Sequence, residues 1–236
     1  MRKPDGPARM VTITSPQDLA SYIEHTLLRA EATTADITKV CEEARQFAFK
    51  AVCVNPAFVR QVSRALLGTS TLAVTVVGFP LGATDSRVKA RETEIALIDG
   101  AQEIDMVLRL GALKEGDYSL AETDISEVVS AASGAPVKVI IETGLLSADE
   151  ITTACKICET AGASFVKTAT GFLGRGAAVD DIVLMRKTLS AHMKIKASGG
   201  IKSFTQAKLL IEAGADRIGA SSSVALVQGQ GASGGY

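Results

Sequence analysis

Charged residues stand within or directly after several apolar, strand-length runs of this sequence. Asp105, Glu142, Lys167 and Lys196 all occupy such positions. Taking a charge out of water is costly, and an apolar replacement would often be as stable. A buried ion-pair network without chemistry is one interpretation. Several charges that converge on one end of a sheet, however, favour a catalytic site.

Two lysines and a carboxylate, without a metal-ligand cluster or a nucleotide-binding loop, fit imine chemistry. A lysine amine attacks a carbonyl, and the protonated imine then accepts electrons from a breaking C–C bond. A free lysine, with a pKa of about 10.4, is a poor nucleophile at neutral pH, so burial or a second cation must favour the neutral amine. Lys167 and Lys196 could exchange these two roles, and residue types alone leave the choice open. Asp105 would move protons through a water, and neither a metal nor an organic cofactor is expected.

A second group of residues is suited to a phosphate. Gly199 and Gly200 follow the seventh apolar run, and Ser221 and Ser222 follow the eighth. Barrels of alternating strands and helices commonly bind phosphate at these two loops, through backbone N–H groups, hydroxyls and a helix N-terminus. The sequence therefore favours a phosphorylated substrate.

Four stretches of the chain resemble one another and begin at residues 48, 100, 162 and 214. In three of them Gly-Ala, a helix stop, leads into a β-rich run. Each interval corresponds to about two βα units, and each interior layer of a (β/α)8 barrel takes its side chains from alternate strands. The residues at the sixth place are therefore expected to form one interior layer: Cys53, Asp105, Lys167 and Gly219.

Apolar runs and helical segments alternate along the chain. Strands are expected at about 23–26, 51–54, 72–77, 103–108, 137–141, 164–168, 193–197 and 216–219. Helices are expected at about 34–47, 57–67, 86–98, 117–132, 148–160, 179–189 and 204–212, after a short helix opened by Ser15-Pro16. Such strands, each followed by a helix, are typical of a parallel sheet covered on all sides. A doubly wound open sheet is the alternative, but no early G-x-G-x-x-G is present, and the repeat favours a closed (β/α)8 TIM barrel.

The chain is expected to hold a single domain. Its 236 residues are close to the roughly 250 typical of such a barrel. We expect residues 15–228 to form the catalytic barrel and residues 1–14 to form a flexible leader. Residues 229–236 are predicted to be a flexible, glycine-rich tail that ends in Tyr236.

The composition argues against several other classes of protein. With 47% hydrophobic and 22% charged residues and a net charge of −1, nothing indicates a nucleic-acid or membrane partner. The sequence shows no signal peptide and no run of about 18 apolar residues, which predicts a cytoplasmic location. Cys155 and Cys158 form a C-x-x-C, but they fall at helical spacing with apolar neighbours, so a buried helix face is preferred to a redox or metal site.

Eight motifs lie in order between about Leu19 and Val227. They are Ile23-Glu24-His25-Thr26-Leu27-Leu28, Val52-Cys53-Val54-Asn55-Pro56, Gly78-Phe79-Pro80-Leu81-Gly82, Glu103-Ile104-Asp105-Met106-Val107, Ile140-Ile141-Glu142-Thr143, Phe165-Val166-Lys167-Thr168-Ala169-Thr170-Gly171-Phe172, Lys196-Ala197-Ser198-Gly199-Gly200-Ile201 and Arg217-Ile218-Gly219-Ala220-Ser221-Ser222. Together they resemble the deoxyribose-phosphate aldolase family. Eight motifs in the family's order and spacing are far more specific than any one of them.

The resemblance implies a metal-independent class I aldolase that reversibly cleaves 2-deoxy-D-ribose 5-phosphate to D-glyceraldehyde 3-phosphate and acetaldehyde. It implies that Lys167 forms the Schiff base and that Lys196 lowers the pKa of Lys167. Asp105 would relay protons, and a homodimer is expected. The positions that the resemblance assigns to the phosphate are Gly171, Gly199, Gly200, Ser221 and Ser222.

Three more positions follow from the resemblance. Glu24 stands where the family usually has aspartate, so a contact with a substrate hydroxyl would come from a side chain one methylene longer. Cys53 matches a cysteine near the site that aldehyde adducts attack in some members, although a small buried strand residue is the simpler interpretation. Tyr236 matches a tyrosine that often ends a mobile tail and assists proton transfer at the acetaldehyde-derived carbon.

Three other functions remain as alternatives. Another imine-forming sugar-phosphate aldolase would keep the same lysine chemistry. A metal-independent phosphosugar isomerase would use Glu142 as its base and form no covalent adduct. A sugar-phosphate sensor would bind without turnover, but the combination of Asp105, Lys167 and Lys196 argues against it.

Overall fold

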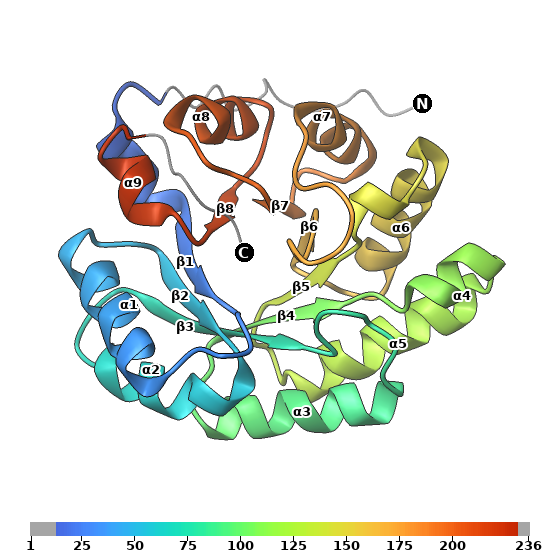
Figure 1. Ribbon diagram of the computed structural model, residues 1–236. Helices are drawn as coiled ribbons and strands as arrows, with labels where there is room; N and C mark the ends of the chain where they lie inside the picture. Colours follow the sequence, from blue (N-terminus) through green and yellow to red (C-terminus); the bar gives the residue numbers. More distant parts are fainter. Residues whose placement is uncertain (1–12, 231–236) are drawn as a thin grey trace.

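Eight strands pair side by side in the order of the chain, and the first closes the sheet by pairing with the last (Figure 1). The computed structural model describes residues 13–230. The strands are β1 (Ile23–Leu27), β2 (Ala51–Val54), β3 (Leu72–Val77), β4 (Glu103–Val107), β5 (Val137–Ile140), β6 (Phe165–Lys167), β7 (Lys194–Ser198) and β8 (Arg217–Ala220). All the pairs are parallel. The predicted (β/α)8 TIM barrel is confirmed.

The helices lie outside the strands (Figure 1). They are η1 (Pro16–Tyr22), α1 (Thr34–Gln46), η2 (Pro56–Phe58), α2 (Val59–Ala65), α3 (Ser86–Ile98), α4 (Leu110–Glu115), α5 (Tyr118–Ala131), η3 (Thr143–Leu145), α6 (Ala148–Thr160), α7 (Val179–Thr188), α8 (Phe204–Glu212) and α9 (Ser223–Val227). The η elements are 3-10 helices, and η1 is the short helix expected after Ser15. Helix α4 was not predicted, because a helix of six residues is too short to show a clear apolar period.

Local sequence fixes where several helices begin. The side chain of Thr33 accepts a hydrogen bond from the backbone N–H of Asp36, and Ser147 does the same for Glu150. Both acids bond back to the cap residue, so each start is a capping box. These caps hold α1 and α6 in place behind their strands.

Successive side chains of each strand point to opposite faces of the sheet. One set therefore faces the helices, and the other set faces the barrel axis. Outward-facing residues such as Ile104 and Met106 pack against the helices in the main hydrophobic core. On the side of β1–β3, part of the inner face is apolar and lies beside the charged Glu24 of β1. Its residues are Leu28, Ala51, Cys53, Val74 and Val76. The inner face on the side of β4–β7 instead carries charged side chains, and these form the candidate site.

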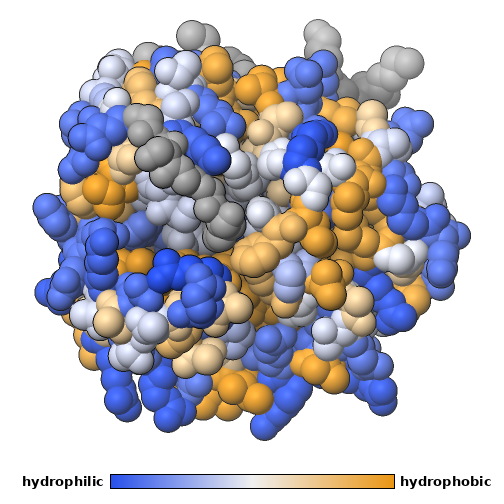
Figure 2. Space-filling model, in the orientation of Figure 1, coloured by the Kyte–Doolittle hydropathy of each residue, from blue (hydrophilic) through white to orange (hydrophobic). Residues whose placement is uncertain are grey.

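The face of the molecule shown in Figure 2 mixes hydrophilic residues with groups of hydrophobic ones. Within residues 13–230, no helix is long and apolar enough to cross a membrane. Cys155 and Cys158 are buried, free cysteines on α6, as the helical spacing predicted. The predicted leader and tail lie largely outside the described residues, so their boundaries stay predictions.

Candidate active site

The carboxylate of Asp105, on β4, is the centre of the charged interior. Lys138 Nζ donates to its Oδ1 at 2.8 Å, whereas Lys167 and Lys196 Nζ donate to its Oδ2 at 2.7 and 2.6 Å. None of these four residues is more than 2% exposed. The structure therefore brings together Asp105, Lys167 and Lys196, three of the four residues predicted for catalysis, and it adds Lys138, which was not predicted.

The register of the strands explains this convergence. Asp105 is paired with Lys138 across β4 and β5, and Lys167 is paired with Lys196 across β6 and β7. Neighbouring strands lie only about 4.8 Å apart, and paired residues point to the same face. Four long side chains are thus directed to one place on the barrel axis.

Glu24, on β1, joins this network from the opposite side of the barrel. Lys196 Nζ donates to Glu24 Oε2, and Lys138 Nζ lies 3.6 Å from Glu24 Oε1. Lys138 also lies 2.6 Å from Glu103 Oε2. Three lysines thus face three carboxylates, so the buried charges balance when all are ionised. Glu24 was predicted to bind substrate, and the structure places its fully buried carboxylate against Lys196.

The surroundings shift the pKa values of the two candidate lysines in opposite directions. Burial lowers the pKa of Lys167, and the positive charge of Lys196 lowers it further, against the effect of Asp105. Burial also disfavours the charged form of Lys196, but Asp105 and Glu24 outweigh it and hold the pKa of Lys196 well above its usual value. Lys196 therefore stays protonated, whereas Lys167 loses its proton more easily.

Asp105 stays ionised in this setting. Burial alone would raise its pKa, but Lys138, Lys167 and Lys196 together hold the pKa of Asp105 well below its usual value. A carboxylate kept ionised between two amines can accept a proton from one side and return it to the other.

The interior layer predicted from the repeat lies on the inner face of the barrel. Gly219, on β8, leaves room for Lys196, because a Cβ there would lie 3.0 Å from Lys196 Cε. Cys53 is fully buried in the apolar half. Burial raises the pKa of the Cys53 thiol to about 11, so the thiol is protonated at neutral pH and is a weak nucleophile.

The glycines predicted to bind phosphate lie in two loops that touch each other. Gly171 follows β6, and Gly199 follows β7, with φ angles of 85° and 90° that favour glycine. A Cβ on Gly199 would lie 3.0 Å from Gly176 Cα and 3.6 Å from Gly171 Cα. Gly200 is exposed, as is Ser221 before α9, and Ser222 is half-buried.

Glu142, at the end of β5, anchors the first of these loops. Its Oε2 accepts hydrogen bonds from the backbone N–H of Thr170 at 3.1 Å and from Thr170 Oγ1 at 2.5 Å. The residue is fully buried and has a φ of 54°, and burial raises the pKa of its carboxyl group. Glu142 therefore holds the backbone next to Gly171.

This geometry tests neither the predicted role of Tyr236 nor the expectation that the enzyme works without a metal. Tyr236 lies outside the described residues, so its role stays a prediction. Residues 13–230 contain no group of three or more His, Cys, Asp or Glu side chains that could hold a metal ion.

Comparisons with known proteins agree with this description. Residues 18–235 match the family described as "DeoC/LacD family aldolase". The deoxyribose-phosphate aldolase of Streptococcus gordonii is 52% identical over 218 residues, which are 92% of this chain and 99% of that protein. That of Bdellovibrio bacteriovorus is 51% identical over 92% of this chain and 99% of its own length.

A solved structure is also similar. The deoxyribose phosphate aldolase of Aeropyrum pernix, described as tetrameric, has a TM-score of 0.84 and 34% identity, with 91% of each chain covered. The oligomeric state of the present chain stays a prediction.

A closed (β/α)8 barrel with a buried lysine–carboxylate network on its axis has the architecture of a barrel enzyme. Within this class of barrel enzymes, the chain belongs to the DeoC/LacD family of aldolases, which are lyases.

Proposed function

We propose that this aldolase reversibly cleaves 2-deoxy-D-ribose 5-phosphate to D-glyceraldehyde 3-phosphate and acetaldehyde through a Schiff base on Lys167. The observation that supports this most directly is the shared contact of Lys167 and Lys196 with Asp105 Oδ2. Burial and the neighbouring cation lower the pKa of Lys167, which is what an amine nucleophile needs. The names of the similar proteins support the choice of substrate.

In the proposed reaction, the neutral amine of Lys167 adds to the C1 aldehyde of the open-chain sugar. The carbinolamine loses water and becomes a protonated imine. The C2–C3 bond then breaks as the C3 hydroxyl loses its proton, and the bonding electrons move to the imine nitrogen to give an enamine. D-Glyceraldehyde 3-phosphate leaves. Protonation of the enamine at C2 and addition of water release acetaldehyde and restore Lys167.

Asp105 and Lys196 would supply the proton transfers in this scheme. Asp105 accepts a proton when Lys167 becomes neutral, and it returns one to the carbinolamine hydroxyl, directly or through a water. Lys196 keeps its positive charge beside the nitrogen and so favours the neutral amine. Glu24 would then keep Lys196 charged and in position.

The phosphate would bind at the loops after β6, β7 and β8. Gly171, Gly199 and Gly200 offer backbone N–H groups there, and Ser221 and Ser222 offer hydroxyls. Because these loops begin just beyond Lys167 and Lys196, a phosphate in them would hold the other end of the sugar over the amines. Cys53 would pack below the site, and Tyr236 would assist the proton transfer at C2, as the family resemblance implies.

Borohydride trapping tests this function. The protein is incubated with 2-deoxyribose 5-phosphate or with acetaldehyde, reduced and digested, and the added mass is located in the peptides. The proposal expects the adduct on Lys167. An adduct on Lys196 would exchange the two lysine roles. Binding of the sugar phosphate without an adduct would instead favour the isomerase or the sensor.

A further inference from the structure

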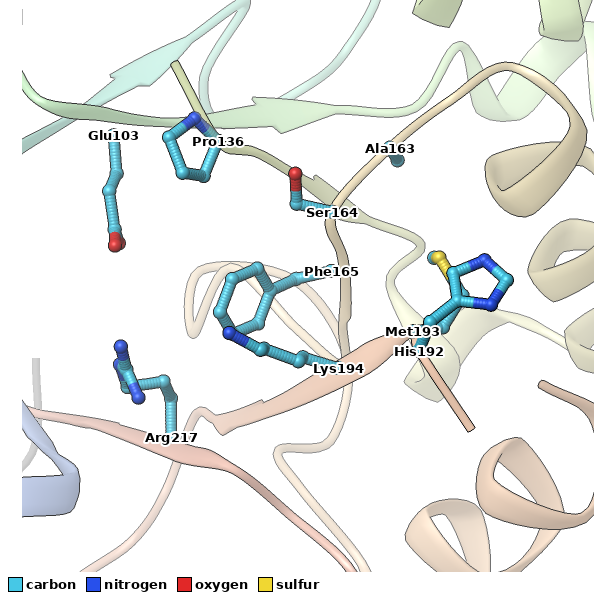
Figure 3. A pocket seen from close by; sticks show the side chains of 9 residues that line it. All are labelled: Glu103, Pro136, Ala163, Ser164, Phe165, His192, Met193, Lys194 and Arg217. Carbon is cyan, nitrogen blue, oxygen red and sulfur yellow. The ribbon is translucent and has the colours of Figure 1, made fainter. Parts of the chain in front are cut away.

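A cavity lies at the opposite end of the barrel from the catalytic loops (Figure 3). Its volume is about 350 Å³. Glu103, Phe165, Lys194 and Arg217 line it and are the first residues of β4, β6, β7 and β8. Asp105, Lys167 and Lys196 stand two residues further along their strands, so the cavity lies next to the catalytic network but opens on the other side.

Two positive side chains face this cavity without a close carboxylate of their own. In the part of the chain that the structure describes, no carboxylate oxygen lies within 4 Å of Lys194 Nζ. For Arg217 the nearest such contact is 3.8 Å, from Nε to Glu24 Oε1. That carboxylate is already bonded to Lys196. Within the same described range, the buried Nε of Arg217 makes no hydrogen bond.

The negative group in the lining does not offset these two charges. Glu103 Oε2 lies 2.6 Å from Lys138 Nζ, so its charge is matched by a lysine outside the lining. Figure 3 shows Glu103 and Arg217 pointing into the same space from β4 and β8, with the Phe165 ring and the end of Lys194 beside this space. The cavity therefore presents more positive than negative charge.

Phe165 holds the cations at this place. Lys194 Nζ lies 5.4 Å from the centre of its ring, and Arg217 Cζ lies 5.6 Å from it. Cations within about 6 Å of an aromatic face are attracted to it. Lys194 is an exposed residue, and its ammonium nevertheless stays beside the ring. The ring thus pre-positions a flexible ammonium beside a planar guanidinium, a pair suited to phosphate oxygens.

We propose that this cavity binds the phosphate group of a small phosphate monoester. A phosphate dianion would match this excess of positive charge and give the Arg217 guanidinium acceptors for its N–H groups. The volume is at the lower end of the roughly 300–1,000 Å³ of small-molecule sites, so it fits a small organic part beside the phosphate. Free inorganic phosphate shares the recognised chemistry. The site is separate from the loops proposed to hold the substrate phosphate.

Lys194 is a better position than Arg217 for a substitution that tests this site. Arg217 approaches Glu24 and, through it, Lys196, so its replacement would also disturb the catalytic network. Within residues 13–230, Lys194 makes no hydrogen bond or ion pair with that network, and its ammonium lies beside the Phe165 ring. Lys156, an exposed lysine on α6, is a matched control for the loss of one positive charge.

Protection of lysines from acetylation tests the site in the wild-type protein. The protein is treated with a limiting amount of an acetylating ester, with inorganic phosphate, with glycerol phosphate or with sodium chloride at equal ionic strength. Modified lysines are then quantified by mass spectrometry. At ten times the dissociation constant, either phosphate should slow acetylation of Lys194 about tenfold and leave Lys156 unchanged. Protection by glycerol phosphate at lower concentration would show that the organic part is bound as well.

Equal protection of Lys194 and Lys156, or equal protection by sodium chloride, would overturn the proposal. A pair of variants gives a second measurement. Glycerol phosphate should raise the Tm of Lys156→Met as much as that of the wild type, and that of Lys194→Met by less, while both variants still form the borohydride adduct. The same rise in Tm in both variants would rule the site out.

Discussion

Lys167 and Lys196 donate hydrogen bonds to the same oxygen of Asp105, at 2.7 and 2.6 Å. The other oxygen is held by Lys138, so Asp105 cannot turn toward one amine without losing a bond elsewhere. A proton that leaves one amine therefore changes the electrostatic environment of the other at once. This coupling is the basis of the first two predictions.

Replacing Lys196 should shift the pH dependence of the reaction. In Lys196→Met the cation beside Lys167 is lost, while the attraction of Asp105 remains, so the pKa of Lys167 rises. A smaller fraction of the amine is then neutral at pH 7, and the rate profile moves to higher pH. Loss of proton transfer should also lower kcat by about 10² to 10⁴-fold. Cleavage of 2-deoxyribose 5-phosphate is measured from pH 6 to 10, with Lys156→Met as control. An unmoved profile would contradict the role given to Lys196.

Removing the charge of Asp105 should destabilise the protein most at low and neutral pH. Asp105 is the one carboxylate within 4 Å of Lys167 in the described residues. Asp105→Asn therefore leaves a buried ammonium without its partner, which costs about 3–5 kcal/mol. The folded pKa of Lys167 falls further below its unfolded value, so the unfolded chain binds more protons and stability increases with pH in that interval.

The wild type should behave in the opposite way at alkaline pH. The pKa values of Lys138 and Lys196 are raised above their usual value, so their contribution to stability is complete below about pH 10 and is lost as the pH rises through the folded pKa. Urea unfolding from pH 6 to 10 measures the gain in stability of Asp105→Asn, and unfolding from pH 10 to 12 measures the loss in the wild type. A free-energy gap that does not narrow with pH would argue against an unpaired lysine as its cause.

The barrel could be predicted from the sequence because each strand has a local pattern, and this pattern repeats along the chain. Each strand is an apolar run, and the Gly-Ala stops before three of them mark alternate strands. Asp105, Lys167 and Lys196 were found because charged residues in such runs are conspicuous. Lys138 has the same signal, since it lies between Val137 and Val139, whose side chains pack outward. Alternation alone would have placed this lysine inside.

Other features depend on contacts that no local pattern contains. Glu24 and Lys196 are 172 residues apart, and they meet only because β1 closes the barrel against β8. The family resemblance implied a substrate contact for Glu24, and its ion pair with Lys196 could not be predicted from the sequence. The basic cavity at the other end of the barrel could not be predicted for the same reason. Lys194 and Arg217 come from separate strands, and both lie beside Phe165, which belongs to a third strand.

Changing Glu142 should affect the phosphorylated substrate selectively. In Glu142→Gln one oxygen can still accept from Thr170, but an NH2 group takes the place of the buried Oε1, which has no hydrogen-bond partner among the described residues. The loop that carries Gly171 should loosen, and KM for 2-deoxyribose 5-phosphate should rise about tenfold, or about 1.4 kcal/mol. Cleavage of unphosphorylated 2-deoxyribose should change little. Equal losses on both sugars would instead indicate that Glu142 acts in the chemical step.

A methyl group added at Gly219 should disturb catalysis by displacing Lys196. The new Cβ would lie 3.0 Å from Lys196 Cε and 3.0 Å from Ser198 Cβ, which is closer than side chains normally approach. Overpacking of this kind costs about 1–3 kcal/mol. Because the lysine end is the more flexible neighbour, we expect it to move and lengthen its contacts with Asp105 and Glu24. In Gly219→Ala, kcat should therefore fall about tenfold or more, a loss of about 1.4 kcal/mol in transition-state stabilisation.

The matched control for Gly219→Ala is Gly111→Ala. Gly111 lies within α4, and an added Cβ there meets no atom within 4 Å, so alanine should stabilise the protein by about 0.5–1 kcal/mol and leave kcat unchanged. Steady-state kinetics and thermal melting of the two variants separate the effects. If Gly219→Ala loses stability but keeps full kcat, the backbone of β8 has moved instead of Lys196, and the position of this ammonium is less critical than its charge.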